Sequence, residues 1–246
     1  MGDRISKMTK TLSLVIPCYN EAARIDQNAF IQAVERWPWI SFCFVDDGST
    51  DSTSETLAHM ANLSPAFHAI YLPANAGKAE AVRTGIKYLC KNTHADLLGF
   101  WDADLATPLD EAPRFMSLFG EFPQTRVVIG SRCPFLGTNI RRTAWRGLAG
   151  GIVRLLIRFA LGVPVHDTQC GAKIFTRELA EELFEKPFRT RWLFDVEILS
   201  RLGRRLSTTV RECPLNAWFD VPGSKINFRA LTELLFIPIA IRFHLV

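Results

Sequence analysis

The stretch Gly99-Phe-Trp-Asp-Ala-Asp-Leu-Ala-Thr107 decides the fold, because an apolar run stops abruptly at two acidic residues. The apolar side chains of residues 97–101 predict a buried strand. Asp102 and Asp104 follow one residue apart, where the chain leaves the strand and both carboxylates can converge on one hard cation. A solvated turn rich in aspartate explains an isolated pair of this kind equally well. The rest of the chain has to decide between a metal site and a turn.

The residues after the acidic pair predict a helix. Thr107 has the side chain of an N-cap, Pro108 suits the first helical position, and Asp110 lies three residues after the cap. The order is therefore strand, acidic loop and helix. In open α/β sheets, ligands bind beyond the carboxyl ends of the strands, which is where this loop falls.

The same alternation runs through the chain. A second apolar strand, at residues 40–45, also ends in acids, Asp46 and Asp47, and Ser52 with Glu55 fits a capping box for the next helix. Further strands are predicted at residues 12–16, 67–72, 127–130 and 208–214, and helices at 22–35, 52–62, 79–89 and 191–199, with a short strand and helix between 171 and 184. Alternating strands and helices predict an α/β sandwich around a mainly parallel sheet.

Composition narrows the class. The chain has 246 residues, 48% hydrophobic content and a net charge of +4, which allows one sizeable core and favours anionic ligands or membrane surfaces without requiring nucleic acid. Six dispersed cysteines indicate reduced thiols in a cytosolic compartment. The scattered histidines have no zinc-ligand spacing and there is no Gly-x-Ser-x-Gly elbow, so zinc and serine-hydrolase chemistry are unsupported. No apolar run is long enough to cross a bilayer.

Charge changes sign in the middle of the chain. No acidic residue occurs between Glu121 and Asp167, whereas arginines recur there. Residues 141–161 predict a basic amphipathic helix in which Arg141, Arg142, Arg154 and Arg158 accompany an apolar stripe. Such a helix is compatible with a membrane surface, and equally with a core-packed helix whose arginines face solvent.

Five motifs follow one another along the chain: Val15-Ile-Pro-Cys-Tyr-Asn-Glu21, Val45-Asp-Asp-Gly-Ser-Thr-Asp51, Asn75-Ala-Gly-Lys78, Asp102-Ala-Asp104 and Gly130-Ser-Arg132. Taken in this order, they resemble the motifs of the family-two glycosyltransferases of the GT-A fold. The second half resembles dolichyl-phosphate glucosyltransferases, with dolichyl-phosphate mannose synthases as nearest relatives, through Asp167-Thr-Gln-Cys-Gly-Ala-Lys-Ile-Phe-Thr-Arg177, Arg191-Trp-Leu-Phe-Asp-Val-Glu197 and Gly223-Ser-Lys225. The resemblance covers about residues 11–230 and implies a Rossmann-like, three-layer GT-A domain over residues 1–246.

The resemblance also implies roles for single residues. It places the nucleotide sugar at Pro17, Tyr19, Glu21, Asp47, Lys78 and Asp102. Asp102 and Asp104 would hold Mg²⁺ or Mn²⁺, and Arg132, Arg146 and Lys225 would receive phosphate groups as catalytic residues with Asp104. Chemistry supports these roles, because a cation held by carboxylates stabilises a leaving diphosphate and the planar fork of arginine suits phosphate. Asp167, Gln169, Asp195 and Glu197 are either acceptor-site or structural residues, since an ionised phosphate acceptor needs little general base.

The resemblance predicts an inverting, metal-dependent hexosyltransferase that moves glucose from UDP-glucose onto a polyprenyl phosphate, dolichyl or undecaprenyl. Two alternatives stay open, a GDP-mannose-dependent mannosyltransferase and a nucleotide-sugar-binding protein without turnover. Ala106 stands where mannose synthases of this group usually carry glutamine, which favours the glucosyl branch and leaves the third protein ligand of the metal in doubt. We expect a nucleotide-sugar half at residues 11–131, an acceptor half at 132–228 and an amphipathic membrane-proximal tail at 229–246. We also expect peripheral attachment to the cytosolic face of a membrane and no nucleic-acid partner, while the sequence gives no oligomeric state.

Overall fold

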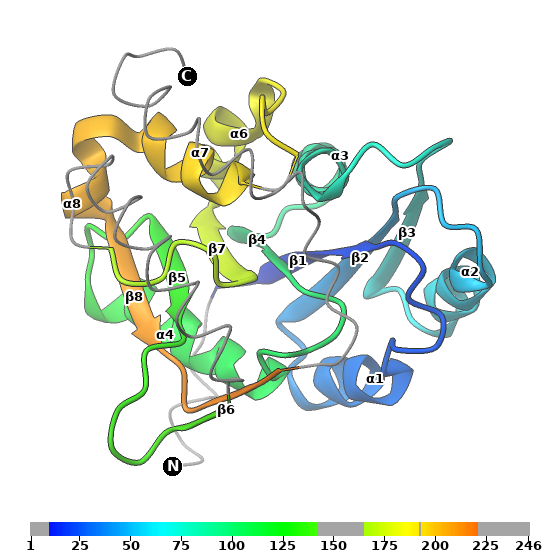
Figure 1. Cartoon of the computed structure of the whole chain (residues 1–246), viewed down its shortest axis with the longest axis horizontal. Coiled ribbons are helices and arrows are strands. Elements are labelled where there is room, and N and C mark those ends of the chain that lie inside the picture. Colours follow the sequence, from blue (N-terminus) through cyan, green and yellow to red (C-terminus); the bar gives the residue numbers. More distant parts are fainter. Residues whose placement is uncertain (1–9, 142–164, 192, 221–246) are drawn as a thin grey trace. The chain divides into compact units, whose positions relative to one another are not determined.

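Strands and helices alternate from the first described residues onward (Figure 1). The computed structural model describes residues 10–141, 165–191 and 193–220, which fall into two units. The first unit comprises residues 1–105 and 172–187, and the second comprises residues 106–171 and 188–246.

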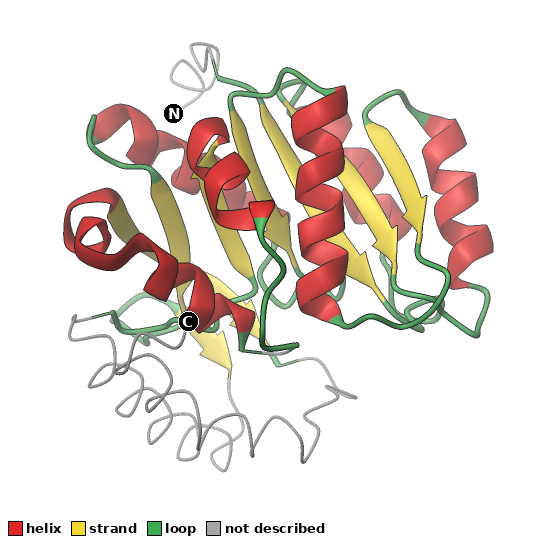
Figure 2. Ribbon diagram, turned by 90° about the horizontal axis from the view of Figure 1, so that it is seen from above, coloured by secondary structure: helices red, strands yellow, loops and turns green. Residues whose placement is uncertain are grey.

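The first unit is built on five strands. Its elements are β1 (Leu12–Cys18), α1 (Gln27–Arg36), β2 (Ile40–Asp46), α2 (Thr53–Leu63), β3 (Phe67–Tyr71), α3 (Lys78–Asn92), β4 (Leu97–Trp101), β7 (Ala172–Thr176) and α6 (Arg177–Glu185). The strand order is β3-β2-β1-β4-β7, in which the first four strands are parallel and β7 is antiparallel to β4. α3 and α6 lie on one face of these strands and α1 on the other, so this unit has three layers (Figures 1 and 2).

The strand order creates a binding position between β1 and β4. The chain leaves β1 toward β2 on one side and reaches β4 on the other, which makes this pair the topological switch point where ligands bind in open α/β sheets. Val15 of β1 lies opposite Phe100 of β4, and Cys18 of β1 lies opposite Asp46 of β2. The segments that follow β1, β2 and β4 therefore emerge at one edge of the sheet.

The core of this unit explains why its central strands are mostly apolar. β1 and β4 are covered on both faces, and every residue of β4 is buried. Phe30 of α1 meets Phe42 and Phe44 of β2 edge to face, with ring centroids 5.1 Å apart in both pairs. Gly99 is required where β4 approaches β7, because a Cβ atom there would lie 2.3 Å from the carbonyl oxygen of Lys173.

The second unit contains two short parallel ladders. Its elements are a 3-10 turn (Leu109–Glu111), α4 (Ala112–Glu121), β5 (Val127–Ser131), β6 (Asn139–Arg141), α7 (Phe194–Leu202), a 3-10 turn (Gly203–Arg205), α8 (Leu206–Thr209), β8 (Val210–Pro214) and β9 (Ala217–Phe219). β5 pairs with β8, which places Ile129 opposite Glu212, and β6 pairs with β9, which places Ile140 opposite Trp218. No helix in the described part of the chain is both long enough and apolar enough to cross a membrane.

The structure confirms the predicted strands and the parallel arrangement of β1 to β4, and corrects several helix starts. The first helix begins at Gln27, because Asp26 accepts the backbone N–H of Ala29 and caps it. Ser52 is the N-cap of α2 but makes no capping hydrogen bond through its side chain, so the predicted box with Glu55 is wrong. Thr107 does not cap a helix, since a 3-10 turn intervenes before α4. α7 begins at Phe194, and the predicted helix at 141–161 lies outside the described residues except for its first residue, which ends β6.

Candidate active site

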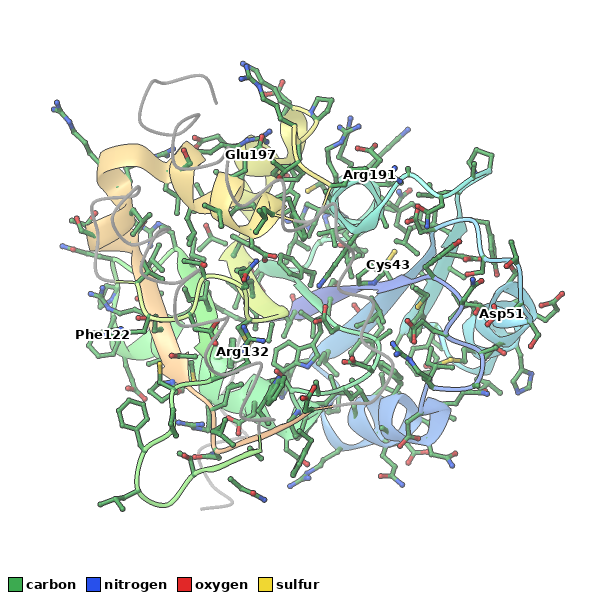
Figure 3. The ribbon with its side chains drawn as sticks, in the orientation of Figure 1. Cys43, Asp51, Phe122, Arg132, Arg191 and Glu197 are labelled. Atoms are coloured by element: carbon green, nitrogen blue, oxygen red, sulfur yellow. The ribbon has the colours of Figure 1, made fainter. Side chains whose placement is uncertain are left out.

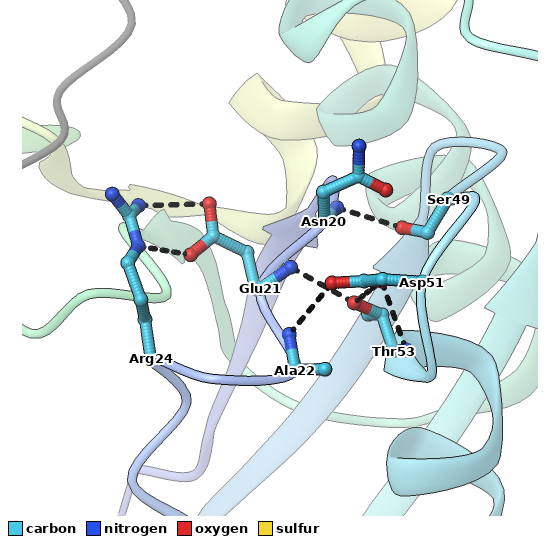
Figure 4. Close-up of polar contacts among 7 residues, drawn as sticks. All are labelled: Asn20, Glu21, Ala22, Arg24, Ser49, Asp51 and Thr53. Carbon is cyan, nitrogen blue, oxygen red and sulfur yellow. Dashed lines mark hydrogen bonds and ion pairs between the residues drawn. The ribbon is translucent and has the colours of Figure 1, made fainter.

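Two loops of the first unit hold each other in place after β1 and β2 (Figure 4). The backbone N–H of Asn20 donates to Ser49 Oγ at 2.9 Å, and Asn20 Oδ1 accepts the backbone N–H of Thr50 at 2.8 Å. The backbone N–H of Glu21 donates to Thr53 Oγ1 at 2.8 Å. These reciprocal bonds give the loop that carries the predicted nucleotide residues Tyr19 and Glu21 a fixed conformation.

The carboxylate of Glu21 has a partner within its own loop. Arg24 donates to both of its oxygens, with Nε at 2.7 Å and Nη2 at 2.8 Å. Glu21 is buried, while Pro17 and Tyr19 are half-buried. The structure therefore presents Pro17 and Tyr19 beside a neutralised carboxylate at the carboxyl end of β1.

The two aspartates at the carboxyl end of β2, Asp46 within the strand and Asp47 after it, fix backbone loops. Asp47 is buried and accepts the N–H of Ala76 at 2.7 Å and that of Gly77 at 2.9 Å, one on each oxygen. Asp46 accepts the N–H of Ser49 at 3.0 Å. Asp47 thus ties the carboxyl end of β2 to the start of α3, where Lys78 is the first residue.

The acidic pair after β4 lies beside Lys78. Lys78 Nζ is 2.5 Å from Asp102 Oδ1, and the two side chains are 29% and 35% exposed. Asp104 is half-buried two residues further on. The structure therefore pairs Lys78, predicted to bind the nucleotide sugar, with one of the two predicted metal ligands, and all three residues belong to the first unit.

Backbone strain marks the same edge of the sheet. Among the described residues, the non-glycine residues with positive φ are Asn20 at 52° and Leu105 at 49°. Asn20 follows β1 and Leu105 follows the acidic pair, so both lie in the loops at the switch point. Asparagine tolerates this conformation, but for leucine it costs about 1–3 kcal/mol, and strain of this kind clusters at ligand-binding loops.

The donors present fit a divalent cation only if the substrate completes its shell. Within the described ranges, no group of three or more acidic, histidine or cysteine side chains gathers as a metal site. Two carboxylates, Asp102 and Asp104, are nonetheless what a Mg²⁺-type site uses when substrate phosphates and water supply the other oxygens. The residues fit a metal that is bound together with a nucleotide diphosphate.

Arg132 is held by a buried carboxylate in the second unit (Figure 3). Its Nε and Nη2 each lie 2.7 Å from an oxygen of Asp167, and its backbone N–H donates to the same carboxylate at 2.9 Å. Asp167 is only 2% exposed, and the guanidinium also lies 5.5 Å from the centre of the Trp218 ring. The bidentate pair fixes the plane of the guanidinium and neutralises part of its charge.

A second carboxylate, from β8, holds the segment that carries Asp167. Glu212 accepts the backbone N–H of Asp167 at 2.9 Å, the backbone N–H of His166 at 2.9 Å and His166 Nδ1 at 2.8 Å. Arg132 directly follows β5 and Glu212 lies in β8. The pairing of these two strands brings the two residues to the same part of the second unit. Sequence reasoning missed Glu212 and Trp218, and the detectable signal for Glu212 was an acidic residue inside a predicted strand.

The contacts of Glu197 are those of a structural carboxylate. It is 5% exposed, accepts the N–H of Arg189 at 3.0 Å and pairs with Arg201 at 2.8 Å. Asp195, two residues earlier, is equally buried. Gln169 is half-buried. Arg146 and Lys225, both predicted to receive phosphate, lie outside the described residues.

Local charges also set the state of the thiol in β1. Burial, followed by the carboxylates of Glu21 and Asp46, raises the pKa of Cys18 well above its ordinary value. A thiol with a raised pKa is mainly protonated near neutral pH, the state in which it is a poor nucleophile.

Burial and hydrogen bonds together set the pKa of Asp51. Burial raises this pKa, but hydrogen bonds from Thr53 and Ala22 outweigh burial and hold it below its usual range.

The fold and these loops together define the class of protein. A family model described as glycosyl transferase family 2 matches residues 13–184, and the chain therefore belongs to this family of glycosyltransferases. The match confirms the resemblance predicted from the five motifs. It makes the chain a glycosyltransferase, and the residues predicted to bind the nucleotide sugar follow β1, β2 and β4 within the matched range.

Curated relatives extend the comparison over most of the chain. A dolichyl-phosphate beta-glucosyltransferase of Trichomonas vaginalis is 31% identical over 235 residues, which is 90% of this chain and 68% of the relative. The dolichyl-phosphate beta-glucosyltransferase of Homo sapiens is 30% identical over 233 residues, which is 89% of this chain and 70% of the relative.

A solved structure confirms the predicted fold. The glucosyl-3-phosphoglycerate synthase of Mycobacterium tuberculosis, solved with Mn²⁺, UDP-glucose and phosphoglyceric acid, superposes with a TM-score of 0.67 at 20% identity. The superposition covers 95% of this chain and 81% of the synthase. The likeness confirms the GT-A arrangement of an α/β fold around a mainly parallel sheet.

Proposed function

We propose that this chain transfers glucose from UDP-glucose onto a polyprenyl phosphate, such as dolichyl phosphate, with inversion at C1. The observation that carries the proposal is the 31% identity to a dolichyl-phosphate beta-glucosyltransferase over 90% of the chain. The family model, which matches residues 13–184, includes both the loops after β1, β2 and β4 and the segment of Asp167. A GDP-mannose donor and a binding protein without turnover are the alternatives that the experiment has to separate.

The donor side is supported by the charges at the switch point. Asp102 and Asp104 would hold Mg²⁺ or Mn²⁺, which would stabilise the negative charge that develops on the diphosphate as it leaves. Lys78, which pairs with Asp102, would then contribute its positive charge to the diphosphate. Pro17 and Tyr19 are proposed to contact the nucleoside, whereas the hydrogen bonds of Glu21 and Asp47 indicate that they support it by shaping the loops.

The acceptor side is supported by the fixed arginine. An oxygen of the lipid phosphate would form the new bond to C1 as the bond from C1 to the diphosphate oxygen breaks, and UDP would leave with that electron pair. No proton has to move, because the phosphate is already ionised. Arg132, held by Asp167, would bind and orient this phosphate, and Arg146 and Lys225 are proposed as further phosphate ligands.

The acceptor sets the location of the enzyme. A polyprenyl phosphate keeps its chain in a bilayer, so the active site has to work at a membrane surface. We propose peripheral association with the cytosolic face, to which the arginine-rich residues 141–158 and the tail at 229–246 would contribute.

The test is a donor and acceptor panel with the full chain. Labelled UDP-glucose, Mg²⁺ or Mn²⁺ and a short-chain polyprenyl phosphate should give a lipid-linked glucose. Product from GDP-mannose alone would overturn the assignment of the sugar. Tight binding of nucleotide sugar without product from any acceptor would favour a binding protein.

A further inference from the structure

The turn between β5 and β6 presents two large apolar side chains to solvent. Phe135 is 58% exposed and Leu136 is 105% exposed. The other exposed large apolar side chains of the described residues reach at most 48%, and none of them forms a consecutive pair. Two adjacent exposed apolar side chains at the end of a loop are typical of a surface that contacts a membrane or another molecule.

Hydrogen bonds and a glycine define the conformation of this turn. The backbone N–H of Thr138 donates to the carbonyl of Phe135 at 3.1 Å, and the Thr138 hydroxyl bonds both the N–H and the carbonyl of Phe135. Gly137 has φ of +90°, which suits the third position of a type II turn that begins at Phe135. This geometry holds Leu136 at the apex, in the position from which it is most exposed. We call Phe135 and Leu136 the apolar tip.

The sequence that flanks the apolar tip carries only one sign of charge. No aspartate or glutamate occurs between Glu121 and Asp167, and arginines stand at 126, 141 and 142 in addition to Arg132, which is paired with Asp167. An anionic lipid surface complements such a segment, whereas an apolar patch on a protein partner would not require it.

The apolar tip is also tied by distance to the proposed phosphate ligand. Leu136 follows Arg132 by four residues, and a fully extended chain spans at most about 14 Å over that separation. The phosphate of a lipid acceptor lies at headgroup level, and apolar groups of interfacial proteins bury about 5–10 Å below it. An apolar tip this close to Arg132 can therefore reach the acyl boundary when Arg132 binds a lipid phosphate.

We propose that the apolar tip inserts into the interfacial region of an anionic bilayer and anchors the acceptor side of the enzyme there. The proposal rests on the proposed function in one respect, the assignment of the lipid phosphate to Arg132. It adds an insertion element that lies outside the basic helix predicted at 141–161 and outside the tail.

The test compares vesicle binding of the full chain and a tip variant. Phe135→Ser combined with Leu136→Asn should lower partitioning onto phosphatidylcholine vesicles that contain phosphatidylserine by about tenfold or more, because it removes two apolar side chains from the interface. Leu63→Asn is the matched control, since Leu63 is an exposed leucine, 47% accessible, at the end of α2, and it should leave partitioning unchanged. All three side chains are exposed and lie outside the buried core, so both variants should stay close to the thermal stability of the parent.

Three results would overturn the proposal. The parent chain could fail to bind these vesicles, the tip variant could bind as well as the parent, or the variant could lose self-association in solution while keeping vesicle binding, which would make the tip a contact between copies.

Turnover separates this proposal from the proposed function. The tip variant should match the parent with a short-chain polyprenyl phosphate in the absence of vesicles and fall behind it with a long-chain acceptor in vesicles. If no acceptor gives product while vesicle binding still depends on the tip, the proposed function fails and the insertion stands. If product forms and vesicle binding ignores the tip, the insertion fails and the function stands.

Discussion

Replacing Asp167 with asparagine tests whether the buried pair with Arg132 holds the second unit together. Asp167 is 2% exposed and receives three N–H groups from Arg132, whose side chain is 21% exposed. Removing one partner of a buried ion pair costs about 3–5 kcal/mol. Asparagine keeps one acceptor oxygen, and water reaches part of the arginine, so we expect a loss of about 2–3 kcal/mol. For a chain of this length that is a fall of about 4–12 °C in Tm.

The assay is thermal unfolding of the parent and two variants. Glu181→Gln provides the control, because Glu181 is 52% exposed and its pair with Arg177 is 3.6 Å long. An exposed pair of this kind is worth at most about 1 kcal/mol. The reasoning is refuted if Asp167→Asn destabilises the chain no more than Glu181→Gln does.

Three further predictions concern packing, pH and thiol reactivity. In urea unfolding, Gly99→Ala should destabilise the fold by about 3 kcal/mol or more, because the added Cβ meets a backbone carbonyl. Gly120→Ala is the control and should be neutral or stabilising, because a Cβ there meets nothing within 4 Å. Equal effects of the two substitutions would contradict the account of the β4–β7 contact. Hydrogen bonds from Thr11 hold the pKa of Asp96 below its ordinary value despite some burial. Asp96→Asn should therefore be less stable than the parent at pH values above the ordinary carboxyl pKa, and this difference in stability should vanish as pH falls through the lowered pKa. A difference in stability that persists in acid would refute this prediction. Burial raises the pKa of Cys43 to about 12 and that of Cys213 to about 11. An alkylating reagent should therefore modify both thiols only after unfolding, as detected by mass spectrometry. Rapid modification of the native chain would contradict their placement in the core.

The donor side was the more predictable part of the molecule, for a physical reason. β1, β2 and β4 are mostly apolar and lead directly into polar loops, and in a parallel sheet the carboxyl ends of neighbouring strands meet at one edge. The sequence pattern therefore indicated both the strands and the place where Asp47 and Asp102 gather. The pairing of Lys78 with Asp102 depends on the turn before α3, which no periodicity reports.

The acceptor side depends on contacts between residues far apart in the chain. Glu212 acts on Asp167 across 45 residues, and Asp167 acts on Arg132 across 35. Neither separation leaves a local pattern. The short ladder of β6 and β9 was missed because three-residue strands carry too little alternation to identify. Helix starts were misplaced where a 3-10 turn or a different cap replaced the expected one, as at Thr107.

The anomeric configuration of the product tests the central claim most directly. Nuclear magnetic resonance of the lipid product made from UDP-glucose, whose glucose is α-linked, should show a β-linked glucosyl phosphate if transfer occurs by a single inverting displacement. The parent should make this product with Mn²⁺, and Asp104→Ala, which removes one of the two proposed metal carboxylates, should make none while keeping the parent's thermal stability. An α-linked product, or undiminished formation of the β-linked product by Asp104→Ala in the presence of EDTA, would contradict the proposed reaction and its metal site.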